Sequence, residues 1–537
     1  MRVAQSLVVA FLVLSLVAEV PAHEEHQHAA GNLEQLGTVH FPVSCSAEAQ
    51  AQFQRAVALL HSFWWQEAEK AFAAVAQTDP TCAMSYWGSA MTLLQNPFTW
   101  PPAPQTLQEG WAIVEKAKAL EPKTHRERDY IAAIAVFYED ADTVDHRTRV
   151  LAYEKAMEQV YLRYPEDREA AVFYALALDV AAPPTDKTYA NQLKAAGILE
   201  QIFVEQPNHP GVAHYLIHSY DHQPIAHRGL AAARRYAQIA PSAPHALHMP
   251  SHIFTRQGLW QESIESNRAS AAATENHYDK LHAMDYLEYA YLQGAQDLAA
   301  KRVFDDMTAL GKVNSEHWTT AYALAAIPAR YTLERRRWAD AASLTLQPNE
   351  YPWSRFPQAE AVAVFARALG AARSGNAVAA KKDMERLQVL RDALVVAKQS
   401  YWAEQAEIQG RVVAAWVARA EGKNEEAIQL MRAAVEREEA TDKHPVSPGP
   451  IVPARELLGE MLLEAQEPRQ ALQEFEHAIR EEPHRFNGLS GAARAAQLAG
   501  DAEKAHTYYA QLVTLCEHGD NGRSELAEAR TFLAQRQ

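Results

Sequence analysis

Histidines are concentrated in one part of this chain and recur there at a fixed interval. Ten of the 23 histidines lie within residues 209–282. Neutral imidazole nitrogens are ligands that zinc and copper accept readily. A repeated spacing therefore predicts imidazoles on one face of a repeated structure, with metal binding as their chemistry. Five histidines keep a 34-residue interval: His214, His248 and His282 in one row, and His218 and His252 in another.

Four of these histidines also form two pairs at helical spacing, which are His214 with His218 and His248 with His252. Residues four apart share one face of a helix, so each pair can reach one ion about 2.0–2.1 Å from each nitrogen. His245, three residues before His248, adds a further imidazole. Pro250 interrupts the second pair. Because proline is comfortable only in the first turn of a helix, a helix start near Met249 and a less regular pair are expected.

A carboxylate extends the candidate metal site. Asp285 follows His282 by three residues, which resembles a His-x-x-Asp ligand pair. The metal is expected to be zinc or copper. The candidate metal ligands are His214, His218, His245, His248, His252, His282 and Asp285.

Two other interpretations of the same residues stay open. In one, the imidazoles line a polar groove for an organic ligand or a peptide, with Tyr215, Tyr286 and Glu288 as ligand-binding residues. In the other, they form a structural network and no cofactor is bound. The chain has no HExxH motif in which a glutamate serves as the base beside a zinc pair. An enzyme using this cluster would have to take Asp285 or Glu288 as its base.

Composition indicates an all-helical protein, built either as several domains or as one extended solenoid. The 537 residues exceed what one compact core holds, glycine is modest at 21 residues, and alanine is abundant. The formal net charge of −16 argues against binding nucleic acid or anionic membrane surfaces.

Apolar residues recur at helical spacing through most of the chain, with breaks at Pro, Gly or Asn. Three segments carry the pattern of the second helix of a repeated hairpin: Glu67-Ala68 to Asp79-Pro80, Gln470-Ala471 to Glu482-Pro483, and Gly500-Asp501 to Tyr508-Tyr509. This pattern resembles the tetratricopeptide (TPR) repeat family. The resemblance implies an all-α solenoid of stacked antiparallel helix hairpins, with a concave groove that binds a protein or peptide partner.

The ends of the repeats divide the chain. Residues 41–440 are expected to form the N-terminal and central repeats and residues 451–537 the C-terminal repeats. Between them, Thr441 to Pro450 carries three prolines and one glycine. Cys45 and Cys82 occupy matching places at the starts of successive hairpins, so a disulfide between them is expected, with two buried thiols as the alternative.

The N-terminus resembles a secretory signal. Arg2 precedes an apolar run from Leu7 to Ala18, too short to span a bilayer, and Ala22 completes a small-residue cleavage site. Residues 1–22 are therefore expected to be removed, which leaves a flexible tail of residues 23–40 with a metal-friendly tract from His23 to His28. A periplasmic or secreted protein without stable membrane insertion follows.

The function expected from the sequence is that of an exported TPR scaffold that binds a protein or peptide partner. It carries a histidine-lined metal or ligand site in its central repeats. The alternatives are a metal-dependent enzyme and a periplasmic copper- or zinc-handling protein.

Overall fold

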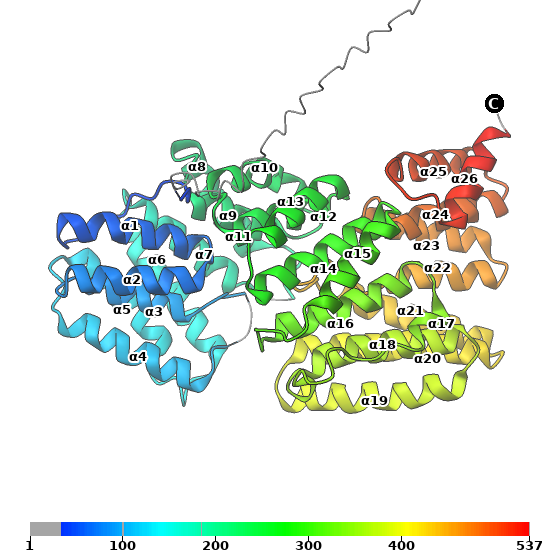
Figure 1. Cartoon of the computed structure of the whole chain (residues 1–537), viewed down its shortest axis with the longest axis horizontal. Coiled ribbons are helices and arrows are strands. Elements are labelled where there is room, and N and C mark those ends of the chain that lie inside the picture. Colours follow the sequence, from blue (N-terminus) through cyan, green and yellow to red (C-terminus); the bar gives the residue numbers. More distant parts are fainter. Residues whose placement is uncertain (1–33, 99–100, 184, 536–537) are drawn as a thin grey trace, which may run out of the picture. The chain divides into compact units, whose positions relative to one another are not determined.

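The computed structural model of this chain describes residues 34–98, 101–183 and 185–535. These residues form α-helices, short 3-10 helices and connecting loops, without any strand. The all-α, TPR-like helical repeat expected from the sequence is therefore the fold. The described residues from Gln35 onward make one compact unit (Figure 1). The expected signal peptide and the tract from His23 to His28 lie outside the described residues.

The N-terminal helices stack as antiparallel neighbours. Several of them begin where a side chain or a proline satisfies the first turn: Ser46 accepts a hydrogen bond from the Ala49 amide, and Thr124 and Glu127 form a capping box. Gly88 lies against the Phe72 ring, where a Cβ would clash, so the two helices that carry Gly88 and Phe72 approach closely. The helices are α1 (Ala47–His61), α2 (Trp65–Thr78), α3 (Ala83–Leu93), α4 (Pro104–Ala119), α5 (His125–Tyr138), α6 (His146–Arg163), α7 (Arg168–Val180) and α8 (Ala190–Glu205).

Several of the central helices are short, and several begin with proline at the first position, where its missing N–H is not needed. The expected break at Pro250 does exist, because one helix ends at His248 and the next begins at Pro250. Met249 between them keeps helical angles (φ −54°, ψ −35°), so the turn continues. The elements are α9 (Pro210–Tyr220), η1 (Ala226–Gly229), α10 (Leu230–Ile239), α11 (Pro244–His248), α12 (Pro250–Arg256), α13 (Trp260–Ala272), α14 (His277–Gln293), α15 (Asp297–Ala309) and α16 (Trp318–Leu333).

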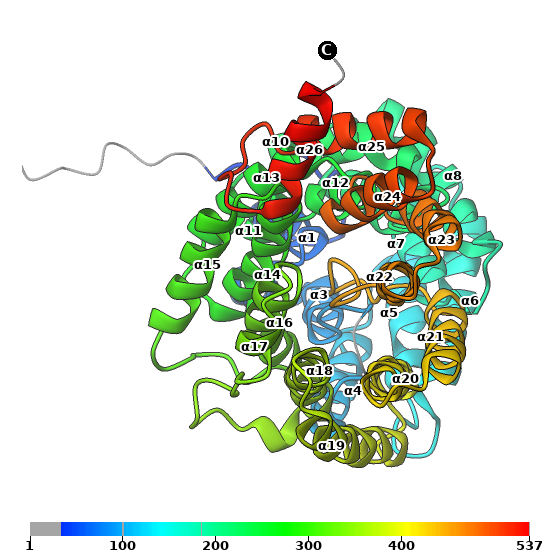
Figure 2. The same ribbon diagram turned by 90° about the vertical axis from the view of Figure 1, so that its right-hand side faces the viewer.

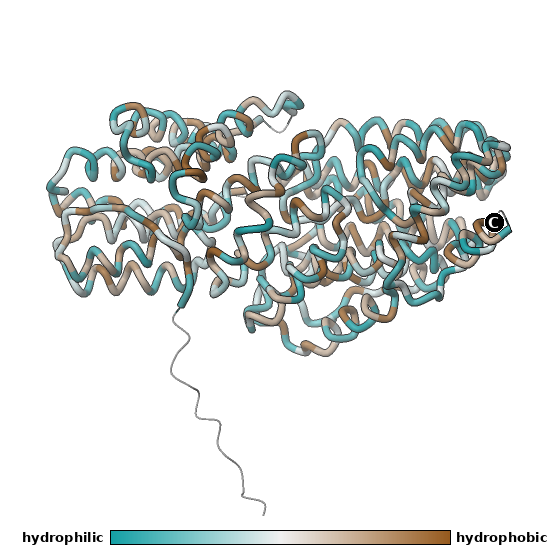
Figure 3. Tube along the Cα trace, turned by 90° about the horizontal axis from the view of Figure 1, so that it is seen from above, coloured by the Kyte–Doolittle hydropathy of each residue, from teal (hydrophilic) through white to brown (hydrophobic). Residues whose placement is uncertain are grey.

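The C-terminal helices continue the stack and then return to its centre. Apolar and polar residues alternate along them, as one-sided burial requires (Figure 3). Helix α24 contacts α14, and the Phe486 amide donates to Gln293 Oε1 at 3.0 Å. The elements are α17 (Trp338–Ala341), η2 (Trp353–Arg355), α18 (Pro357–Arg373), α19 (Ala377–Val396), α20 (Ser400–Ala420), α21 (Asn424–Glu439), α22 (Ala454–Glu464), α23 (Pro468–Glu481), α24 (Phe486–Leu498), α25 (Ala502–Leu515) and α26 (Ser524–Ala534).

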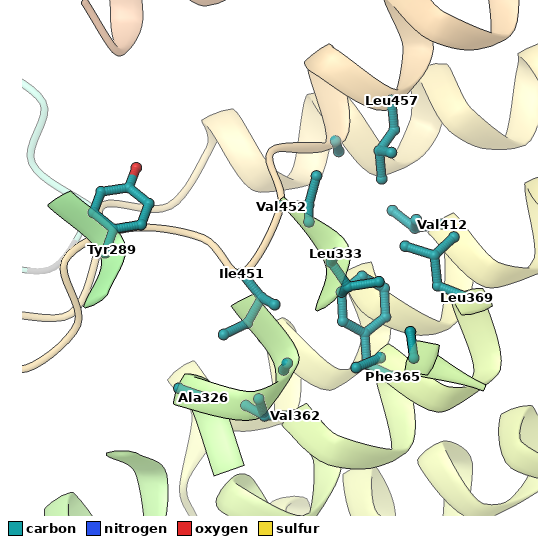
Figure 4. Packing of buried hydrophobic residues seen from close by; sticks show 14 of the residues in the cluster. Tyr289, Ala326, Leu333, Val362, Phe365, Leu369, Val412, Ile451, Val452 and Leu457 are labelled. Carbon is teal, nitrogen blue, oxygen red and sulfur yellow. The ribbon is translucent and has the colours of Figure 1, made fainter. Parts of the chain in front are cut away.

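Residues 441–453, called here the inserted segment, connect α21 to α22 and pack inside the helical array (Figure 2). Arg330 of α16 donates to the carbonyl oxygens of Gly449 (3.1 Å) and Pro450 (2.8 Å). Ile451 and Val452 lie among buried apolar residues of α16, α18 and α22 (Figure 4). The loop that the sequence placed between two sets of repeats thus joins them through the interior.

The first described residues are also packed. Leu36 and Val39, within the segment expected to be a flexible tail, are buried. The Thr38 amide donates to the Asn208 carbonyl oxygen at 2.9 Å. Residues 35–40 therefore belong to the compact unit. Among the described helices, none is both long and apolar enough to cross a bilayer.

Cys45 and Cys82 are joined by a disulfide in the structure, with Cα atoms 5.0 Å apart, while Cys516 is free and buried. Cys45 lies just before α1, and Cys82 immediately precedes α3. The bridge therefore joins the starts of the first two hairpins. These hairpins lie at the N-terminal end of the stack, where the first one has a neighbouring repeat on one side only.

We expect the Cys45→Ala/Cys82→Ala variant to lose about 3–4 kcal/mol of unfolding free energy in the N-terminal repeats, because a bridge over 37 residues restricts the unfolded chain. Denaturant unfolding measures this loss. The wild type under reducing conditions should unfold with the variant. Equal midpoints for oxidised and reduced wild type would contradict the prediction.

Candidate metal centre

Six of the predicted ligands come together where the central helices meet. Helix α9 supplies His214 and His218, α11 supplies His245 and His248, α12 supplies His252 and α14 supplies His282. All are buried except His245, which is partly exposed. Burial lowers the pKa of each imidazole below its usual value of 6.5, and neighbouring imidazoles lower it further in most of them. At neutral pH all six are therefore uncharged potential ligands.

The six imidazoles form two groups of three. Group 1 is His214, His218 and His245, and group 2 is His248, His252 and His282; within each, one nitrogen per ring lies within 4.8 Å of the other two. In group 1, Nε2 of His214 lies 3.1 Å from Nε2 of His218 and 3.2 Å from that of His245. In group 2, the Nε2 atoms of His248 and His252 are 3.0 Å apart. Each helical pair thus receives its third imidazole from another helix.

In three of these histidines, the oxygen atom that Nδ1 faces decides which tautomer the ring adopts. Nδ1 of His214 faces the His61 carbonyl oxygen at 2.6 Å, and Nδ1 of His252 faces the Asp221 carboxylate at 2.9 Å. Nδ1 of His248 faces Oδ1 of Asn267 at 2.7 Å. These oxygens only accept hydrogen bonds, so each Nδ1 carries the proton. The Nε2 atom of each ring then bears a lone pair directed into its group.

The arrangement matches what a bound transition metal needs. Two nitrogens that lie about 2.0–2.1 Å from one ion at angles of roughly 90–110° are about 2.8–3.4 Å apart. The observed Nε2 separations of 3.0–3.2 Å fall in this range. Without a cation, His248 and His252 direct lone pairs at each other, which is unfavourable in a dry interior.

The two groups are adjacent and surrounded by aromatic rings. The ring centres of His218 and His252 are 6.2 Å apart, and those of His245 and His248 are 6.0 Å apart. The Phe63 ring packs on group 1, 4.4 Å from the ring centre of His214. Two ions, one in each group, would therefore be close neighbours in a largely apolar enclosure.

Asp221 links group 2 to the inserted segment. Its carboxylate accepts hydrogen bonds from His252, from Arg256 (2.9 Å) and from Lys443 (2.8 Å). Burial alone would raise the pKa of Asp221, but the two cations hold it well below its usual value. Burial lowers the pKa of Lys443 to about 8, although Asp221 opposes this shift. The carboxylate charge is thus offset by protein cations before any metal binds.

Asp285 does not join the imidazoles, so its assignment as a metal ligand is corrected. Its carboxylate pairs with Arg330, with Oδ1 3.1 Å from Nε, and it belongs to neither group. Asp285 follows His282 by three residues on α14, so its side chain points about 60° away from that of His282 around the helix axis. That rotation turns it toward α16, which carries the arginine.

The other candidate residues have separate places. The Tyr215 hydroxyl lies 3.0 Å from Nδ1 of His61. Tyr286 stacks on His252, with ring centres 5.0 Å apart, and donates to the Ser447 carbonyl oxygen at 3.0 Å. Glu288 is buried without a hydrogen-bond partner, and burial raises its pKa well above the usual value. Tyr286 thus contacts group 2, and the Tyr215 ring contacts group 1, with its centre 5.2 Å from that of His214.

A third cluster was not predicted from the sequence. Oε2 of Glu169 lies 2.9 Å from Nε2 of His61, and Oε1 lies 2.8 Å from Nε2 of His209. Nδ1 of His61 meets the Tyr215 hydroxyl, and Nδ1 of His209 accepts from the Val212 amide. Every ring nitrogen has a partner, so this cluster is a structural network. No spacing signals it, since the helices that carry these residues are far apart in the chain.

Comparisons with known proteins give only weak structural similarity. No protein-family model matches the chain, and no curated protein matches it. The chain is similar to one in the structure of Naa15/Naa10 bound to HypK-THB (13% identity, 91% of this chain and 74% of that chain, TM-score 0.25). It is also similar to the human IFIT1 dimer with PPP-AAAA (14%, 86% and 89%, TM-score 0.36) and with m7Gppp-AAAA (12%, 76% and 86%, TM-score 0.38). At these values the likeness carries no conclusion about function.

The lowered imidazole pKa values predict an acid-sensitive metal-free protein. Below about pH 6.5 the unfolded chain binds protons that the folded chain excludes. The unfolding free energy therefore decreases as the pH is lowered, by at most about 1.4 kcal/mol per pH unit for each histidine. Thermal unfolding between about pH 7 and pH 5 measures this slope. A His214→Asn/His248→Asn/His252→Asn variant should have a shallower slope, and an unchanged slope would contradict the assignment.

Proposed function

We propose that this chain is an exported helical-repeat protein that binds two copper or zinc ions in its central repeats, one in each three-histidine group. The observation that carries the proposal is the direction of the lone pairs. In His214, His248 and His252 the proton sits on Nδ1, while Nε2 faces another Nε2 at 3.0–3.2 Å.

The cluster of Glu169 with His61 and His209 serves as an internal comparison. There a carboxylate lies between two imidazoles and satisfies both by hydrogen bonds. Groups 1 and 2 have no such acceptor between their rings, and nitrogens 3.0–3.2 Å apart leave no room for a water on the line between them. An ion displaced from that line can accept the Nε2 lone pairs that are directed into each group, which supports metal binding over a structural network.

The ligand set favours copper or zinc over other metals. Six neutral imidazoles without carboxylate or thiolate are poor ligands for calcium and magnesium, which prefer oxygen. Three protein ligands for each ion leave a coordination position open, as in catalytic rather than purely structural sites. This open position favours a site that binds or transforms a further molecule.

Binding of a partner or an organic ligand is a second candidate. A cavity of about 510 Å³ lies between the inserted segment and α18, α20, α21 and α23. Its walls include Trp402 and Gln358, whose buried Nε1 and Oε1 atoms have no hydrogen-bond partner. This volume is that of a small-molecule pocket. A small organic molecule or one side chain of a peptide therefore fits it better than an extended segment does.

Export is supported by the disulfide at Cys45 and Cys82, since such bridges persist in oxidising compartments. A periplasmic or secreted location also suits a protein that takes up copper or zinc after folding.

Metal analysis of the untagged, full-length protein tests the proposal. We expect two ions per chain, with one lost in His214→Asn and the other in His248→Asn. Asparagine keeps a donor near the place of Nδ1 but removes the Nε2 ligand. His506→Asn, on the exposed face of α25, is the control and should retain both ions. Absence of metal, or equal metal in all four proteins, would refute the proposal.

Asp221→Asn should weaken the ion of group 2 by about 10–100-fold, because the carboxylate orients His252 and raises its basicity. Competition with chelators measures both affinities. The ion of group 1 should be affected less. Asp383→Asn, a buried aspartate of α19 paired with Arg367, is the matched control and should leave both affinities unchanged.

A further inference from the structure

The charge around the two groups selects among the metals that they can bind. The six ligands are neutral, and the nearest carboxylate that contacts them, Asp221, is already paired with Arg256 and Lys443. Two doubly charged ions would add four positive charges to a buried region that offers no further anion at this contact. Uncompensated buried charge is costly, so two singly charged ions are more favourable. Copper, unlike zinc, has a stable singly charged form, which accepts imidazole ligands.

An apolar cavity of about 50 Å³ lies beside group 1 and is separated from it by one side chain. Phe63 lines this cavity and also packs on His214 and stacks on His245, with ring centres 5.5 Å apart in the latter pair. The other walls include Leu60, Met91, Phe173 and Leu176. Apolar cavities take up small apolar molecules, so dioxygen can partition there.

On these grounds, and resting on the proposed metal centre, we infer that groups 1 and 2 each hold one copper(I) ion and that the pair binds dioxygen between them as peroxide. The open position of each three-coordinate ion accepts one oxygen atom. Each copper(I) gives one electron, so two copper(I) and O₂ become two copper(II) and one peroxide dianion. The O–O double bond of dioxygen becomes the single bond of peroxide without being cleaved, no proton moves, and release of O₂ returns both electrons to copper.

The balance of charge suits this site. Two copper(I) ions with neutral dioxygen carry the same total charge as two copper(II) ions with peroxide. The buried surroundings therefore meet no additional charge when dioxygen binds, and no acid or base beside the ions is required. Binding without proton transfer agrees with six ligands that offer no carboxylate at the centre itself.

The experiment loads the full-length protein with copper(I) without oxygen and then adds dioxygen. We expect one O₂ taken up per two copper ions, a near-ultraviolet peroxide-to-copper absorption band, and no electron paramagnetic resonance signal because the two copper(II) ions are coupled. Removal of oxygen should restore copper(I). His214→Asn should keep the ion of group 2 and lose all O₂ uptake, whereas His506→Asn should behave as wild type.

The outcomes separate the two proposals. Two bound ions without O₂ uptake, or a paramagnetic signal that accounts for all the copper, would overturn the dioxygen inference and leave the metal centre intact. A preference for zinc when both metals compete would do the same. Failure to bind any metal would overturn both. Leu176→Phe, which narrows the apolar cavity, should slow O₂ uptake without changing the copper content, and an unchanged rate would remove the cavity from the route.

Discussion

A buried imidazole has two nitrogens, and a partner for one of them determines what the other can do. At this site the outer partners are a carbonyl oxygen at the end of α1, the Asn267 amide on α13 and the Asp221 carboxylate after α9. They fix protons on Nδ1 and so direct the Nε2 lone pairs inward. The rings are positioned by the stacking of α9, α11, α12 and α14. The acceptors at Nδ1 decide which nitrogen of each ring can bind a metal. The properties of the centre depend on this constraint.

The return of the helical array to its own centre is a second feature of the site. Arg330 is fully buried and bridges Asp285 to the carbonyl oxygens of the inserted segment. That segment carries Lys443 to Asp221 and places two carbonyl oxygens at the Tyr286 hydroxyl. Buried ion pairs contribute little net stability, but loss of one partner leaves a costly unpaired charge. The pairs therefore act mainly to hold one arrangement of the segment beside group 2.

Much of the fold and of the candidate metal centre could be predicted from local sequence patterns. Helical periodicity and the 34-residue interval predict stacked hairpins, and spacing of four predicts the pairs His214–His218 and His248–His252 correctly. Asp285 was assigned wrongly because spacing alone does not show that Arg330, on α16, lies beside it and pairs with it. The cluster at Glu169 escaped prediction because its residues lie on helices far apart in the chain. The row of equivalent histidines also proved to be two groups, since His214 joins one and His248 and His282 join the other.

The sequence by itself determined the helical repeat, the place of the site along the chain and the six imidazoles, because these follow from periodicity and residue type. Tertiary structure alone decided how the imidazoles divide, which nitrogen of each carries the proton, and that a loop with three prolines packs beside them. These depend on atoms brought from α1, α13 and the inserted segment, whose separations along the chain carry no periodic signal. Repeats specify contacts between neighbours, whereas hydrogen-bond partners from distant segments, such as α1 and the inserted segment, are brought to the site only by the tertiary structure.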